Sequence, residues 1–456
     1  PADNVRMAQL ATDAAGNVNI AGTTAEFTKQ ALERKTRSKF QKARPLMIAD
    51  GTKTWASDNS TVTITNNQSF THPNNSKLKF NSTTAAPTSA SARMRCTSLT
   101  KFYLEDTVTV AIYCANWPAS GTSIEIGFSS DGFVTKSFKY TFSGIAAMNW
   151  VRPGIVYFTI STAEDGTATF GGISANAWTS VGGQVATDQM NSVQVAFNSL
   201  NTYTLQVLGV WTNKKSTGKI LMGFDDGLAS QYTEGFAYMQ SKGIRGTIAL
   251  PHELIGTAGY CTQAQLDEIY AAGWDFVGHS SSHPVLTSIN IEAALNEVRK
   301  NKYYCDGRYP RGADCMVYPE NTYNANVTAE CRKAGWRYMR AASRRFMSVD
   351  AFGIDNADAI GSQTLSTMTL QQIKDIILSA ANSGQVLWLY GHNILSANNP
   401  AGLGGAAPTS PTTDYYRDDF RAIIDYIATL KSQGLVEDVT WSELQAHLDG
   451  PMQVYQ

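Results

Sequence analysis

The sequence predicts two folded domains of different class, an all-β sandwich followed by a domain of alternating strands and helices. Two patterns lead to this prediction. Short segments with alternating polar and apolar residues fill residues 46–214, and apolar strand-like segments alternate with helical patterns after residue 219. The length of 456 residues is sufficient for two or three domains that each bury a core.

The composition excludes several classes of protein. The 37 Lys+Arg residues balance the 38 Asp+Glu residues, so no overall charge would hold nucleic acid or an anionic membrane. No apolar stretch reaches the roughly 18 residues of a membrane span, and the first residues lack the pattern of an export signal. The six cysteines include no C-x-x-C pair, which favours buried free thiols. We therefore expect a globular protein whose partners bind at local sites.

The first 45 residues differ from the rest of the chain. Lysines and arginines crowd their second half, and residues 23–35 have helical spacing. Aromatic residues are scarce among these charges, which argues against nucleic-acid binding. We interpret residues 1–45 as a basic, partly helical lead-in.

Residues 46–214 contain many short strand-like segments and no helical pattern. Examples are TVTIT (61–65), TVTVAIY (107–113) and SIEIGF (123–128), with turn-rich spacers between such segments. This pattern predicts an antiparallel, jelly-roll-like sandwich, a fold that can serve as a carbohydrate-binding module. Its tryptophans would either stack on sugars or pack in the core, and we favour the core; they include Trp117, Trp150, Trp178 and Trp211.

From residue 219 the pattern is that of repeated strand–helix units. Buried strands are predicted at KILMGF (219–224) and QVLWLY (385–390). Two helices should begin with capping boxes, at Thr262 with Gln265 and at Thr369 with Gln372, and Thr440 should begin the last helix. Such units give parallel strands joined by right-handed crossovers, with functional residues at the carboxyl ends of the strands.

Polar side chains that suit metal chemistry follow three of these strands. Asp225 and Asp226 come directly after the first strand, His279 and His283 follow the strand DFVG, and His392 follows QVLWLYG. The two histidines four residues apart would share one face if their segment formed a helical turn. Three ligands, a spare carboxylate and a spare imidazole are the groups that a metal-dependent hydrolase needs.

The sequence at these positions resembles the polysaccharide deacetylases of carbohydrate esterase family 4, which share the NodB homology domain. The matching motifs occur in the family's order: GFDDG (223–227), HSSSH (279–283), VYPENTY (317–323) and LWLYGH (387–392). The resemblance covers residues 219–449. It implies a distorted (β/α) barrel.

The resemblance also implies roles for the residues at the strand ends. Asp226, His279 and His283 would bind a divalent metal, most often Zn²⁺. Asp225 would act as general base and His392 as general acid. A metal-bound water and a polarised acetyl carbonyl fit this division of roles.

The third motif departs from the family. A backbone N–H of this motif helps to hold the oxyanion in the family, and because Pro319 has no N–H, Glu320 is the candidate donor. Tyr318 stands where family members commonly have an arginine that orients the base. Arg344 or Arg345 could supply the missing charge from a later strand end.

The last motif and the loop after it suggest how the substrate cleft is bordered. The family commonly has a leucine in the acetyl pocket two residues before the histidine, where this chain has Tyr390, with Leu389 one residue earlier. The loop at 396–416 is too long for an ordinary connection and should border the cleft. Aromatic candidates for its rim are Trp388, Tyr415 and Tyr416.

Together these features predict a protein that removes acetyl groups from a polysaccharide outside the cell, in a phage tail or spike or as a secreted enzyme. We expect an acetylated glycan as partner, no nucleic acid, no membrane span, and a homo-oligomer that would be a trimer in a spike. The alternative is a glycan-binding adhesin or tail-fibre module whose barrel is inactive. A lyase or glycosidase is disfavoured, because glycosidases use carboxylate pairs across a cleft.

Overall fold

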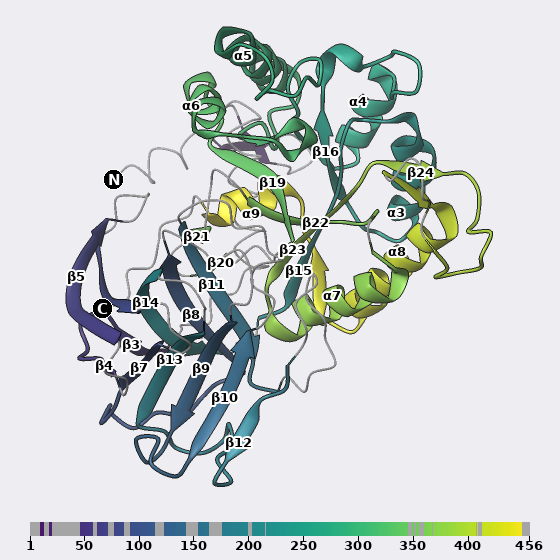
Figure 1. The fold of residues 1–456 in the computed structure, drawn as a ribbon. Helices are drawn as coiled ribbons and strands as arrows, with labels where there is room; N and C mark the ends of the chain where they lie inside the picture. The colour runs from purple at the N-terminus through teal and green to yellow at the C-terminus, as the bar shows by residue number, and fades with distance from the viewer. Residues whose placement is uncertain are drawn as a thin grey trace.

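The computed structural model shows an N-terminal part made of strands and a C-terminal part of strands and helices (Figure 1). From the first 45 residues it describes only a short hairpin of β1 (Leu10–Thr12) and β2 (Val18–Ile20), so the helix expected over 23–35 lies outside the described residues. The described residues are 10–12, 18–20, 46–57, 62–71, 77–85, 92–114, 123–142, 154–163, 176–198, 203–214, 216–344, 349–350, 353–354, 360–366, 368–406, 408 and 413–448.

The N-terminal part consists of two antiparallel sheets. The first contains, in spatial order, β12 (Thr179–Val181), β10 (Ser137–Phe142), β9 (Ser123–Ser129), β13 (Ser192–Asn198), β7 (Ala92–Cys96) and β4 (Ala56–Ser57). The second contains β11 (Gly154–Ser161), β8 (Thr107–Cys114), β14 (Tyr203–Asn213), β6 (Lys77–Ala85) and β5 (Val62–Thr71), with β3 (Leu46–Asp50) also paired to β14. The period-two segments seen in the sequence are the strands of these sheets.

The two sheets share one hydrophobic core. In β9 the buried residues include Ile124 and Ile126, and in β8 they include Val108, Val110 and Ile112. All five belong to a single cluster that draws on both sheets. The alternation of apolar side chains therefore turns one face of each sheet towards the other, as period-two strands require.

The described tryptophans of this part belong to its interior. Trp178 stacks on Phe138 with ring centroids 4.4 Å apart, and Trp211 is buried. Trp117 and Trp150 lie outside the described residues. Cysteines follow the expectation as well, because Cys96 and the four described cysteines of the C-terminal part are buried free thiols.

The C-terminal part is built on parallel strands that close into a barrel. Its seven strands are β15 (Gly218–Phe224), β16 (Gly246–Leu250), β17 (Asp275–Gly278), β18 (Cys315–Val317), β19 (Tyr338–Arg344), β22 (Ile360–Thr364) and β23 (Val386–Gly391). β23 pairs with β15 and closes the ring. An eighth strand, β26 (Val436–Asp438), lies beside the first residues of β15, whereas β16 lies beside the last ones.

Helices connect these strands and cover the barrel. They are η2 (Gln231–Phe236), α3 (Ala237–Ser241), η3 (His252–Leu254), α4 (Gln263–Ala271), α5 (Ile291–Arg308), η4 (Pro319–Asn321), α6 (Ala325–Ala334), α7 (Leu370–Ser383), α8 (Arg417–Ser432) and α9 (Trp441–Leu448). The capping boxes at Thr262 and Thr369 are both confirmed. None of the helices in the described ranges is long and apolar enough to cross a membrane.

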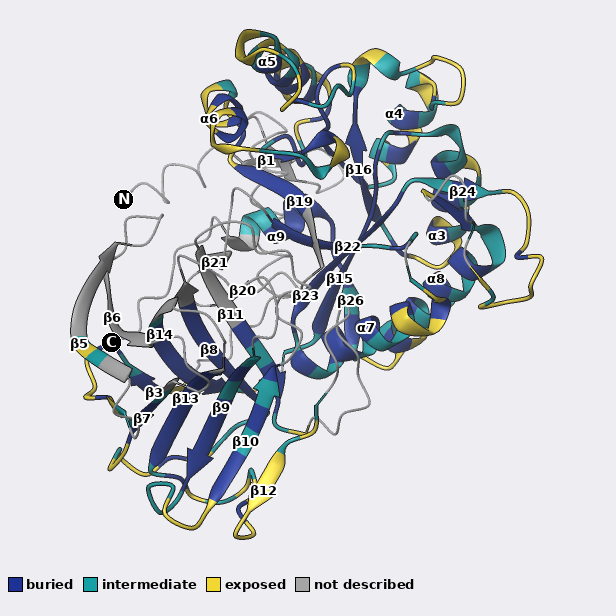
Figure 2. Cartoon of the chain, in the orientation of Figure 1, coloured by how far each residue is buried: buried dark blue, intermediate teal, exposed yellow. Residues whose placement is uncertain are grey.

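Strand residues divide between a helix-side core and the barrel interior. In β23, Leu387 and Leu389 belong to the helix-side cluster, and Trp388 and Tyr390 belong to the interior cluster. Figure 2 shows the central strands buried along their length. Trp441 of α9 stacks on Trp388 at 5.4 Å between ring centroids, so α9 fills the interior at the end where the strands begin.

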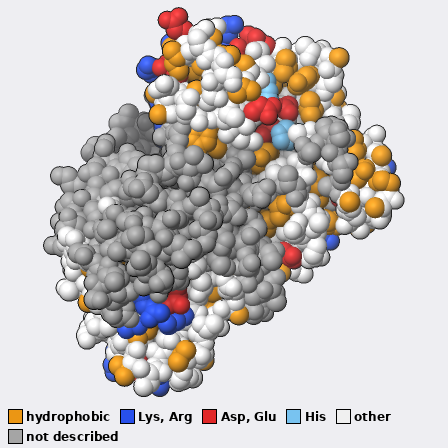
Figure 3. All heavy atoms as spheres, viewed as in Figure 1, with side chains coloured by type: hydrophobic (Ala, Val, Ile, Leu, Met, Phe, Trp, Pro, Cys, Tyr) orange, Lys and Arg blue, Asp and Glu red, His pale blue; other side chains and the backbone are white. Residues whose placement is uncertain are grey.

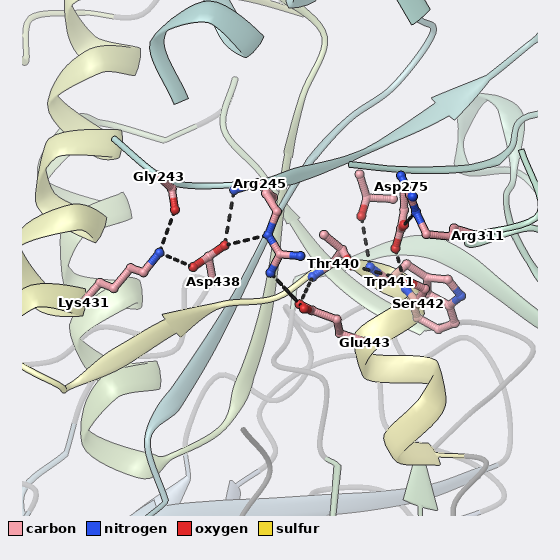
Figure 4. A network of polar contacts seen from close by, with 11 residues as sticks. Gly243, Arg245, Asp275, Arg311, Lys431, Asp438, Thr440, Trp441, Ser442 and Glu443 are labelled. Atoms are coloured by element: carbon pink, nitrogen blue, oxygen red, sulfur yellow. Dashed lines mark hydrogen bonds and ion pairs between the residues drawn. The ribbon is translucent and has the colours of Figure 1, made fainter. Parts of the chain in front are cut away.

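A network of polar contacts joins α9 and β26 to the same end of the barrel (Figure 4). Arg245, just before β16, donates two hydrogen bonds of 2.9 Å to the carboxylate of Glu443 and lies 3.6 Å from Asp438. The backbone N–H of Ser442 donates to Asp275 at 2.6 Å. Because β16 and β26 pair with different ends of β15 and not with each other, the contacts of Arg245 hold these two strands together.

We predict that Glu443→Ala destabilises the C-terminal part by about 3–5 kcal/mol, because it leaves the guanidinium of Arg245 without its main partner in a mostly buried site. Denaturant unfolding measures this loss. Lys242→Ala removes an exposed ion pair with Asp425 and should cost less than about 1 kcal/mol. Equal effects of the two substitutions would contradict the importance of this network.

Candidate active site

The residues predicted from the strand ends meet at one end of the barrel. Asp225 and Asp226 follow β15, His279 follows β17, and His392 follows β23. Carboxyl ends of parallel strands share one rim, which brings these distant residues together. Figure 3 shows histidine and acidic side chains gathered in the upper half of the face viewed.

Three predicted ligand atoms form a small triangle. The Nε2 atoms of His279 and His283 are 3.2 Å apart, and they lie 3.4 and 3.3 Å from Oδ1 of Asp226. Within the described residues, this trio is the group of histidine, cysteine and acidic side chains whose geometry suits a metal ion.

The triangle fits a zinc-like cation. Ligand bonds of about 2.0–2.1 Å at tetrahedral angles place ligand atoms about 3.3–3.4 Å apart, close to the observed spacing. Nδ1 of His279 is 2.9 Å from the carbonyl oxygen of Val317, which leaves Nε2 free to bind a metal. Oδ1 of Asp226 is buried and has no hydrogen-bond partner in the part of the chain that the structure describes.

The electrostatics favour a charged carboxylate at Asp226. Burial alone would raise its pKa, but contact with His279 and the charges of the nearby imidazoles outweigh burial and lower the pKa to about 2. A carboxylate that stays ionised at neutral pH is ready to bind a cation without first losing a proton.

The segment that carries His279 and His283 is not a helical turn. The prediction that the two histidines share one helical face required such a turn, so that part of the prediction is wrong. Residues 279–283 form a loop in which Ser280 and His283 have positive φ values of 59° and 64°. Asp226 also has a positive φ, 79°. Left-handed backbone at non-glycine residues is costly and concentrates at functional sites, so here strained loops bring the ligands together.

A buried arginine pairs with Asp225. Arg340 of β19 is 0% exposed, and its Nη2 donates a hydrogen bond to Oδ2 of Asp225. The guanidinium also lies over the ring of Tyr390, 4.0 Å from its centroid. Arg340 thus brings a positive charge to Asp225 from the strand after the third motif. The side chain of Arg344 and the whole of Arg345, from which this charge was expected, lie outside the described residues.

His392 lies at the same rim, close to Asp225. Its Nε2 is 3.8 Å from Oδ2 of Asp225, and 19% of its side chain is exposed. The amide of Gln231 donates hydrogen bonds to the carbonyl oxygens of both Asp225 and His392. Gln231, which belongs to none of the sequence motifs, therefore fixes the two loops relative to each other.

The residues of the third motif differ in burial. The Tyr318 side chain lies in the helix-side core, stacked on Tyr323, and its backbone N–H donates to the carbonyl oxygen of Arg340. Pro319 is buried, and Glu320 is exposed with φ 52°. The oxyanion role of the Glu320 N–H stays a prediction.

Several residues expected near the substrate lie elsewhere. Leu389 belongs to the helix-side core, opposite Tyr390, which takes it out of the expected acetyl pocket. Trp388 and Tyr415 are buried and do not form a cleft rim. The loop after β24 (Asn393–Leu395) folds onto the start of α8, where Asn399 donates to Asp419 at 2.8 Å, before β25 (Asp414–Tyr416) pairs with β24.

Residues 212–339 match the family model for polysaccharide deacetylases. Over this segment, which includes Asp225, Asp226, His279 and His283, the chain is similar to polysaccharide deacetylases. YxkH of Bacillus subtilis (strain 168), whose own assignment as a polysaccharide deacetylase is provisional, is 24% identical over 126 residues, or 27% of this chain. This chain covers only 45% of the length of that relative.

Solved structures similar to this chain include a deacetylase and a CE4 domain. The Streptococcus pyogenes deacetylase PplD, in complex with acetate, is 20% identical, with a TM-score of 0.28 and coverage of 31% of this chain and 62% of PplD. The Xyl-CE4 domain of a multidomain xylanase from the hindgut metagenome of Trinervitermes trinervoides is 17% identical, with a TM-score of 0.34 and coverage of 52% and 94%. Neither similarity assigns a substrate to this chain.

The geometry of the triangle predicts that His283→Ala lowers bound zinc well below one equivalent per chain, because two protein ligands hold the ion poorly against water. Elemental analysis after desalting measures the bound metal. His392→Ala is the matched control, since His392 lies outside the triangle, and it should keep its zinc. Undiminished zinc in His283→Ala would show that the ligand assignment is wrong.

Proposed function

We propose that the deacetylase domain hydrolyses acetyl groups from an acetylated polysaccharide, with a divalent metal, best matched by Zn²⁺, at Asp226, His279 and His283. The observation that carries this proposal is the placement of a buried carboxylate and a partly exposed imidazole beside the ligand triangle. A bound metal ion would lower the pKa of a water molecule and polarise the acetyl carbonyl.

Asp225 has the position of the general base. Its carboxylate is nearly buried beside the ligand triangle, and Arg340 holds one of its oxygens. A carboxylate tethered at one oxygen keeps a fixed orientation, so that the other oxygen can take a proton from water. Arg340 is thus a positioning residue, which acts on the reaction through Asp225.

His392 has the position of the general acid. Its imidazole is partly exposed at the rim, and its Nε2 is 3.8 Å from Oδ2 of Asp225. It can therefore give a proton to the amine or sugar hydroxyl that leaves when the acetyl bond breaks. The N–H of Glu320 is proposed to donate to the developing oxyanion.

The inactive adhesin loses its main support. It was suggested by the missing arginine of the third motif, and Arg340 supplies that charge from the adjacent strand.

We also propose that the two N-terminal sheets form a jelly-roll-like sandwich that binds glycan or spaces the deacetylase domain. Their shared core supports a sandwich. A protein of this kind would act on capsule or exopolysaccharide outside the cell, in a phage tail or as a secreted enzyme.

We predict that Asp225→Asn and His392→Ala each reduce acetate release by about 10²–10⁴-fold, because each removes a positioned proton donor or acceptor. The double variant should lose far less than the product of the two effects, since both residues act on one transition state. Acetate released from a panel of acetylated glycans gives the rates. Wild-type protein that binds such a glycan with zinc present and releases no acetate would falsify the proposal in favour of the adhesin.

Arg340→Met should lower kcat with little change in KM, because the base loses its orientation while the substrate keeps its contacts. Stability should also fall, by about 3–5 kcal/mol, since Asp225 is left buried without its partner. Arg337→Met is the matched control, because Arg337 directly precedes the same strand and its side chain is half exposed. Unchanged kcat in Arg340→Met would exclude a positioning role.

A further inference from the structure

Helix α5 holds the loop that carries both histidine ligands. Oδ1 of Asn301 accepts a hydrogen bond of 3.0 Å from the N–H of His279. One turn earlier, Oε2 of Glu297 accepts bonds of 2.9 Å from the N–H groups of Ser281 and Ser282. Residues 297 and 301 are four apart and so lie on the same face of the helix.

Further contacts of the loop are made by side chains and by the backbone of η3. The N–H of His283 donates to Oγ of Ser280 at 3.1 Å, and the hydroxyl of Ser282 donates to Oε1 of Glu297 at 3.0 Å. The carbonyl of the fully buried Ser281 accepts from the N–H of Glu253 at 3.0 Å. Side-chain acceptors thus bind four backbone N–H groups of this segment, those of His279, Ser281, Ser282 and His283.

This support is needed because the loop is strained. Ser280 and His283 both have left-handed φ values, which non-glycine residues keep only where the surroundings over-determine them. The chain could relax if the N–H groups of Ser281 and Ser282 lost their acceptor. His283 follows directly, so its Nε2 would leave the position 3.2 Å from that of His279.

We propose that Glu297, with Asn301, is a positioning residue that forms the metal site in advance of the metal and thereby sets metal affinity. The inference rests on the proposed function only in requiring that the triangle binds a divalent ion. Glu297 makes three charge-assisted hydrogen bonds to two successive residues, which are stronger than bonds to a neutral acceptor. No contact with substrate is involved.

The test is a zinc titration of the metal-free full chain against a chelator of known affinity, without substrate. Glu297→Ala should weaken zinc binding about 10–100-fold, the usual effect of losing a residue that orients ligands. Glu297→Gln keeps an acceptor but no charge, so its zinc affinity should fall between that of Glu297→Ala and the wild type. Glu292→Ala is the matched control, because Glu292 is exposed in the first turn of the same helix.

A merely structural role gives a different result. It would lower the melting temperature of the metal-free protein and leave zinc affinity unchanged, and that outcome in Glu297→Ala would overturn the proposal. Should this variant fail to fold, wild-type affinity in Glu297→Gln would overturn it instead. Wild-type protein that binds no zinc would overturn both this inference and the proposed function. Zinc binding without acetate release would remove the proposed function alone.

Discussion

The buried ion pair between Arg340 and Asp225 is the interaction on which the barrel interior depends. The two residues belong to β19 and to the end of β15, which lie on opposite sides of the ring. A guanidinium with no exposed surface is tolerable only when a negative charge and aromatic faces surround it, and Tyr390 and Trp388 provide those faces. One charge pair thus joins the two walls of the barrel and fixes the carboxylate at the rim.

Much of the C-terminal part could be predicted because local signals there agree with the tertiary structure. The capping boxes at Thr262 and Thr369 form as predicted, since they depend only on residues three apart. Parallel strands bring the predicted residues Asp225, His279 and His392 to one rim for a topological reason. The family motifs added their order along the chain.

What could not be predicted depends on contacts between distant segments. Arg340 was not predicted because it lies within a strand, whereas the arginine was expected at a strand end. The alternation in Tyr338–Arg344 does place residues 338 and 340 on one face. Leu389 and Trp388 were misplaced for a related reason, since β23 is buried on both faces and has no polar alternation to orient it. The loop at 279–283 takes its conformation from α5, which no local pattern reveals.

The arrangement around β15 also sets an order in which the chain can acquire structure during synthesis. Among the described residues, the strand partners of the N-terminal sheets lie between residues 46 and 213, so these sheets need no strand that is synthesised later. β15 must wait for β23, more than 150 residues later, and for β26 and α9 after that. The three ligand residues, present by residue 283, and the α5 side chains that hold their loop are therefore synthesised long before Arg340 and His392. A metal ion captured at that stage would organise a barrel that is still open.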